Sequence, residues 1–150
     1  MRIMILNGPN LNLLGVRNPA IYGHQTYQNL VDFLHQEAAH LELELTLRQS
    51  QYEGDLIESL HEAHARDYDA ILLNAGAFTH YSYALYDAID AIDVPVIEVH
   101  LSDLSKREES WRQKSVLTPV CMARFMGDGF GSYKAALAYC KKTFSPAKKG

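Results

Sequence analysis

The chain has 150 residues, of which 47% are hydrophobic and 21% are charged, and its net charge is -4 at pH 7. This length fits a single domain over residues 1–150 that buries roughly two-thirds of its unfolded surface. The charge balance excludes the basic footprint of a nucleic-acid binder, and no apolar run approaches the ~20 residues that cross a bilayer. The only two cysteines, Cys121 and Cys140, are typical of buried apolar side chains in a cytosolic protein. We therefore expect a cytoplasmic protein.

Strand-like and helical apolar patterns alternate along the chain. In chain order they predict a strand at 3–6, a helix at 27–40, a strand at 43–47, a helix at 53–65, a strand at 69–74, a helix at 81–92 capped by Thr79, strands at 94–99 and 121–126, and a helix at 133–142. The strand at 69–74 is almost wholly apolar, as expected when helices cover both faces of a sheet. This alternation predicts an α/β fold with a parallel sheet.

One connection is much longer than this fold requires. Residues 7–26, about twenty in number, join the first strand to the first helix, whereas such loops usually need two to six. Long loops at the carboxyl ends of parallel strands are where such sheets bind ligands. Polar residues also follow three predicted strands, at 7–10, at Asn74 and at 98–100. The carboxyl edge of the sheet is therefore the predicted site.

The long loop carries Arg17 and Tyr22 five residues apart. A tyrosine with a pKa near 10 is a poor base at neutral pH unless a cation stabilises its phenolate, which Arg17 could do. Gly15 and Gly23 could act as hinges that let the loop close as a lid. On their own, the two residues fit a packed tyrosine and a solvated arginine better than a catalytic pair.

Glu98 and His100 alternate on one strand, so both can point to the same face of the sheet. A carboxylate next to an imidazole fixes its tautomer and makes it a better proton donor near neutrality. The backbone amides of Leu101 and Ser102, with the Ser102 hydroxyl, could hold a carboxylate. Arg112 could add a charge-assisted hydrogen bond to it. A histidine at a strand end with a purely structural partner is the alternative.

Asn74 ends a buried strand, and we expect His80 in the first turn of the next helix with Asp87 seven residues on. Residues seven apart share a helix face, so His80 and Asp87 could address one ligand or a neighbouring subunit. The remaining histidines lack a third ligand at metal-binding spacing. Dinucleotide and P-loop motifs are missing, and only the Gly127–Gly131 turn gives a weak phosphate-loop signal.

Taken together, these segments resemble the type II 3-dehydroquinate dehydratases. The matching motifs are residues 7–19 with Tyr22-Gly23, 48–50 with Glu53-Gly54, 74–80, 97–102, and Arg107-Glu108, in the order and spacing of that family. The resemblance implies a flavodoxin-like three-layer sandwich with a five-stranded parallel sheet. It also implies conversion of 3-dehydroquinate to 3-dehydroshikimate in the shikimate pathway, without cofactor or metal, by a dodecamer of trimers.

The resemblance also assigns roles to residues. Tyr22 would be the base, Arg17 the group that activates it, and His100, oriented by Glu98, the acid that protonates the departing hydroxyl. Asn10 would hold a water that stabilises the enolate. The residues implied to bind substrate are Asn74, His80, Leu101, Ser102 and Arg112, with Asp87 acting at the contact with a neighbouring subunit.

Some positions depart from the family pattern. Tyr86 stands where an arginine is usual, Tyr81 where a threonine is common, and Asp128 replaces an aromatic residue. The segment 109–112 is one residue longer than usual, so Arg112 is assigned by allowing an insertion. Two alternatives stay open: a flavodoxin-like module that binds a flavin or another phosphate-bearing ligand at Gly127–Gly131 without turnover, and a silent paralogue that has lost its substrate clamp.

Overall fold

The computed structural model describes residues 1–146, apart from the side chain of Tyr22. The strands are β1 (Arg2–Asn7), β2 (Glu44–Gln49), β3 (Ala70–Asn74), β4 (Val96–His100) and β5 (Ala123–Met126), and the α-helices are α1 (Pro19–Tyr22), α2 (Tyr27–His40), α3 (Glu53–Ala65), α4 (Tyr83–Asp90) and α5 (Phe130–Phe144). The five strands form one sheet in the order β2-β1-β3-β4-β5, with every neighbouring pair parallel. None of the helices described is long and apolar enough to cross a membrane.

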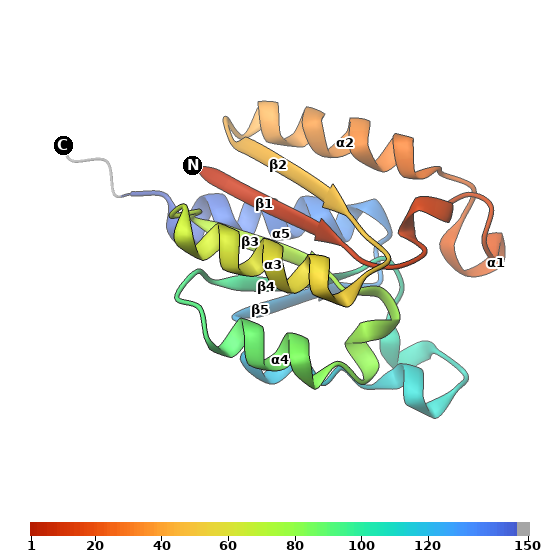
Figure 1. Cartoon of the computed structure of the whole chain (residues 1–150). Helices are drawn as coiled ribbons and strands as arrows, with labels where there is room; N and C mark the ends of the chain where they lie inside the picture. The colour runs from red at the N-terminus through yellow and green to blue at the C-terminus, as the bar shows by residue number, and fades with distance from the viewer. Residues whose placement is uncertain (147–150) are drawn as a thin grey trace.

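The sheet separates two apolar clusters, each beneath two helices (Figure 1). On one face, α2 and α5 cover the side chains of Ile3, Ile5, Leu72 and Ile97. On the other face, α3 and α4 cover the residues that alternate with these, including Met4, Leu6, Ile71 and Leu73. Alternation within fully buried strands is what two covered faces require. The predicted three-layer α/β fold is confirmed.

The helix predicted at 81–92, with Thr79 as its cap, is wrong at its start. Residues Gly76–His80 form a 3₁₀ helix instead, and α4 begins at Tyr83. Ser82 is the N-cap, because its hydroxyl accepts a hydrogen bond of 3.0 Å from the backbone amide of Leu85. His80 therefore does not lie in the first turn of α4, and the argument that it shares a helix face with Asp87 does not hold.

The first and third strands are followed by glycine-containing segments that touch each other. A Cβ on Gly8 would lie 2.5 Å from the carbonyl carbon and oxygen of Ala75, and Gly76, with φ of 59°, faces the carbonyl of Pro9. Only glycine permits so close an approach of two backbones. The contact brings the start of the long loop against the segment after β3. That loop also contains a 3₁₀ helix (Leu11–Leu13) and α1, elements that the sequence pattern did not predict.

Candidate active site

A pocket of about 60 Å³ opens at the carboxyl edge of the sheet, where β1, β3 and β4 end. Seven of the predicted site residues line it: Arg17, Asn74, His80, His100, Leu101, Ser102 and Arg112. They come from the long loop, from the last residues of β3 and β4, and from the segments that follow these strands. The parallel topology thus gathers residues almost a hundred positions apart into one site, as the polar strand ends predicted.

His100 and Glu98 form a buried pair beneath this pocket. His100 Nε2 lies 2.8 Å from Glu98 Oε1, and the two side chains are 6% and 1% exposed. The second carboxylate oxygen of Glu98 accepts a hydrogen bond of 2.5 Å from the Thr118 hydroxyl. Burial raises the pKa of Glu98, but the hydrogen bond and charge of His100 and the hydroxyls of Ser115 and Thr118 outweigh it and lower the pKa overall. Glu98 is therefore ionised at neutral pH, and Nδ1 is the nitrogen of His100 left for a ligand.

His80 has a different hydrogen-bonding environment. Its Nδ1 lies 2.7 Å from the backbone carbonyl of Lys114, and because a carbonyl only accepts, Nδ1 carries the proton. Burial is the main cause that lowers the pKa of His80; the positive charges of His100, Arg112 and Arg107 add to it, and the Lys114 carbonyl opposes it. His80 is thus neutral at pH 7, with Nε2 as an acceptor.

Arg112 is held by its neighbours in the inserted segment. Its guanidinium carbon lies 4.1 Å from the centre of the Trp111 ring, and Nε lies 3.3 Å from a carboxylate oxygen of Glu109. Nε is buried without a hydrogen bond among the described residues. The Trp111 ring also packs edge-on against His80, with ring centres 5.3 Å apart. The longer segment therefore still brings Arg112 into the pocket.

Asn74 is fixed from below. Its side-chain nitrogen donates to the Tyr133 hydroxyl at 2.9 Å, and that hydroxyl donates to Asn7 Oδ1 at 2.6 Å. The backbone amide of Gly76 donates to Asn74 Oδ1 at 3.3 Å. An amide side chain has two donors and two acceptor lone pairs, so one of each is left to face the pocket.

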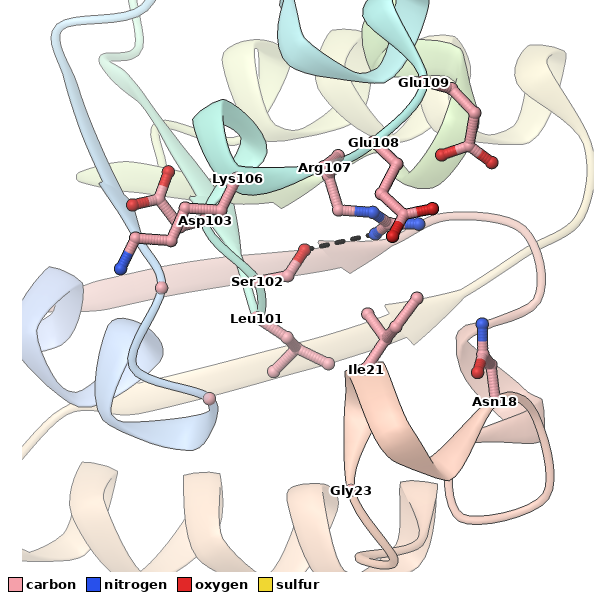
Figure 2. Close-up of a pocket in the computed structure, with 12 residues that line it drawn as sticks. Asn18, Ile21, Gly23, Leu101, Ser102, Asp103, Lys106, Arg107, Glu108 and Glu109 are labelled. Atoms are coloured by element: carbon pink, nitrogen blue, oxygen red, sulfur yellow. Dashed lines mark hydrogen bonds between the residues drawn. The ribbon is translucent and has the colours of Figure 1, made fainter.

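A wider depression of about 670 Å³ adjoins the pocket and shares Leu101, Ser102 and Arg107 with it. Figure 2 shows Asn18 and Ile21 of the long loop on one side and the segment from Leu101 to Glu109 on the other. Arg107 donates from Nη1 to the Ser102 hydroxyl at 3.3 Å. Arg107 thus lines the site, whereas from the sequence it was noted only in the Arg107-Glu108 motif and had no predicted role in the site.

The remaining predicted residues lie elsewhere. Asn10 is exposed at the rim of a small hollow that also contains Arg17. Asp87 is exposed on α4 and does not line the pocket of its own chain. Tyr22 ends α1, but its side chain lies outside the part of the chain that the structure describes. The hydroxyl of Tyr22 therefore stays a prediction.

The described residues form neither a metal site nor a phosphate-binding loop. Within residues 1–146, no group of three or more His, Cys, Asp and Glu residues could hold a metal ion. In the Gly127–Gly131 turn, the amides of Asp128, Gly129 and Gly131 already donate to Ser132 Oγ, to Leu101 O and to Asp128 O. The Asp128 carboxylate would also repel a phosphate. The turn therefore lacks the convergent amides of a phosphate-binding loop.

The carboxyl edge of the sheet in this α/β fold carries a buried acid–base pair and three arginines. This combination is typical of an enzyme that acts on a small anionic substrate. The family model "Dehydroquinase class II" matches residues 1–141, and the chain belongs to this type II dehydroquinase family. The 3-dehydroquinate dehydratase of Bacillus licheniformis is 54% identical over 94% of this chain and 96% of its own. That of Bacillus pumilus is 52% identical over 91% of each chain.

Solved structures agree with this assignment. The type II dehydroquinase from Butyrivibrio crossotus superimposes with a TM-score of 0.91 at 39% identity, covering 93% of this chain and 97% of that one. The type II dehydroquinase from Propionibacterium acnes gives a TM-score of 0.89 at 33% identity, over 94% and 96% of the two chains. The resemblance of the motifs to this family is thereby confirmed.

Proposed function

We propose that this chain is a 3-dehydroquinate dehydratase, a hydro-lyase of the shikimate pathway that converts 3-dehydroquinate to 3-dehydroshikimate and water. The observation that carries the proposal is the family match over residues 1–141, together with a pocket in which His100 is paired with Glu98. Elimination through an enolate needs a base for the proton next to the ketone and an acid for the departing hydroxyl. The residues of the long loop and of β4 supply both.

Tyr22 is the proposed base. It removes a proton from the carbon next to the ketone, and the electron pair moves onto the ketone oxygen to form an enolate. A phenol with a pKa of about 10 needs a nearby cation to work at neutral pH, and Arg17 lines the pocket on the same loop. A water held by Asn10 stabilises the enolate oxygen. Closure of the loop would then exclude bulk water.

His100 is the proposed acid. When the enolate collapses, the carbon–oxygen bond to the hydroxyl breaks, and a proton from His100 Nδ1 turns the leaving hydroxide into water. Because Glu98 can only accept, His100 Nε2–H must donate to it at 2.8 Å. The active acid is thus the doubly protonated imidazolium, which Glu98 orients through this hydrogen bond.

The other pocket residues suit a hydroxylated carboxylate. Arg112, with the amides of Leu101 and Ser102, binds the substrate carboxylate. His80 Nε2 is an acceptor, so it binds a substrate hydroxyl, and Asn74 offers one donor and one acceptor. In the proposed assembly, a cytoplasmic dodecamer of trimers, Asp87 completes the site of a neighbouring subunit. No cofactor takes part.

The direct test is the growth of ultraviolet absorbance from the conjugated enone when 3-dehydroquinate is added to purified protein. Tyr22→Phe and His100→Ala should each lower kcat by at least ~100-fold, because general acid–base groups contribute that much. Borohydride should not trap substrate on the protein, in contrast to a lysine Schiff-base enzyme. The absence of turnover by folded wild-type protein would rule out the proposal, and near-normal turnover by either variant would rule out the role of that residue.

A further inference from the structure

Beneath the pocket, a buried tyrosine joins three elements through its hydroxyl. Tyr133 of α5 is fully buried, and its hydroxyl lies between Asn7 at the end of β1 and Asn74 at the end of β3. These two asparagines are register partners on adjacent strands, so their side chains point to the same face of the sheet. The mechanism above uses neither Tyr133 nor Asn7.

The hydrogen bonds of this group run in one direction. Asn7 Oδ1 can only accept, so the Tyr133 hydroxyl donates to it at 2.6 Å. The hydroxyl oxygen therefore has only lone pairs to offer Asn74, whose side-chain nitrogen donates to it at 2.9 Å. The single hydroxyl proton of Tyr133 thus specifies which end of the Asn74 amide faces downward.

This orientation is needed because the amide torsion is soft. The terminal torsion of asparagine is broad and roughly two-fold, so exchange of its oxygen and nitrogen costs little without fixed partners. Among the described residues, the other partner of the Asn74 amide is the Gly76 backbone amide, at the long distance of 3.3 Å. The position of the Asn7 side chain costs free energy, because its Nδ2 is buried without a hydrogen bond among the described residues.

We propose that Tyr133 is a positioning residue, which orients the Asn74 amide so that its remaining N–H and lone pair match the substrate. This inference rests on the proposed function, because it assumes that Asn74 binds substrate. It assigns a role to Asn7 as well, namely to accept the Tyr133 proton and so fix the direction of the chain of hydrogen bonds.

The test is a double-mutant cycle on kcat/KM. Tyr133→Phe keeps the buried ring and should lower kcat/KM on the order of tenfold, as the loss of one buried hydrogen bond predicts. In an Asn74→Ala background, the same substitution should have less than about a twofold effect, because the residue through which it acts is gone. Tyr68→Phe is the matched control: it removes a buried hydroxyl, bonded to Thr46 Oγ1 at 2.7 Å, away from the pocket, and should leave kcat/KM unchanged.

Wild-type kcat/KM in Tyr133→Phe, or a tenfold loss that persists in the Asn74→Ala background, would overturn the inference. If Tyr133→Phe does not fold, Asn7→Ala in the same two backgrounds answers the same question. Neutron diffraction from deuterated crystals gives a readout that does not depend on turnover. The Asn74 amide should have one orientation in the wild type and a mixed or reversed one in the variant, and one unchanged orientation in both would contradict the proposal even if the wild type proved inactive.

Discussion

Replacement of Glu98 by glutamine tests the proposed acid most directly. Glu98 is an acceptor for two donors at once, His100 Nε2 at 2.8 Å and the Thr118 hydroxyl at 2.5 Å. Glutamine has nearly the same shape but only one oxygen, so its amide nitrogen must face one of these partners. The substitution therefore removes the negative charge and one acceptor while preserving the packing.

The magnitude follows from the type of hydrogen bond that is lost. A hydrogen bond to a charged group contributes about 1.5–3 kcal/mol, against about 0.5–1.5 kcal/mol for a neutral one. The difference, on the order of 1.4 kcal/mol, corresponds to about tenfold in rate. In Glu98→Gln, kcat at neutral pH should fall by about tenfold, because His100 Nε2 loses its charged acceptor.

The assay is the initial rate of enone formation at saturating substrate and neutral pH. Glu62→Gln is the matched control, since Glu62 pairs with Arg48 at 2.6 Å on α3 and β2, away from the pocket. It should leave kcat unchanged. A wild-type kcat in Glu98→Gln would refute the assignment of His100 as an acid that depends on Glu98.

Three further outcomes are expected. Thr118→Val removes one donor to the same carboxylate and should lower kcat several-fold, which the enone assay measures; an unchanged rate would show that this hydroxyl does not orient the pair. Gly8→Ala should destabilise the fold by about 1–3 kcal/mol in thermal unfolding, because its Cβ would lie 2.5 Å from backbone, whereas Gly54→Ala has open space and should not. Trp111 is the only tryptophan and packs on His80, so binding of substrate or product should change its fluorescence. An unchanged fluorescence at saturating ligand would argue against binding in this pocket.

The sequence patterns predict the fold well where packing repeats along the chain. The bounds of α2 and α3 agree with the predicted ranges, because their apolar residues recur at helical spacing over several turns. The start of α4 was mispredicted because Thr79 and Ser82 are both suitable caps. The choice between them depends on the backbone path of the 3₁₀ turn, in which the Thr79 hydroxyl is buried without a hydrogen bond among the described residues.

The site is predictable in part for a similar reason. Asn74 and His100 end strands, and parallel topology alone brings strand ends together. Tyr133 and Thr118 could not be found this way, because each meets its partner across separate elements and neither spacing nor composition encodes the contact. Arg107 lies near the site in sequence, but only its hydrogen bond to the Ser102 hydroxyl shows that it reaches the pocket.

Two histidines in the same pocket have different hydrogen-bond partners, and this difference suits the proposed elimination. His100 Nε2 donates to the Glu98 carboxylate, whereas His80 Nδ1 donates to the Lys114 carbonyl. Burial and the positive charges of its neighbours lower the pKa of His80, so its Nε2 stays an acceptor. In the proposed mechanism, His100 is the proton donor for the leaving hydroxyl and His80 the acceptor for a substrate hydroxyl. A single histidine cannot do both, since the imidazolium has no acceptor nitrogen.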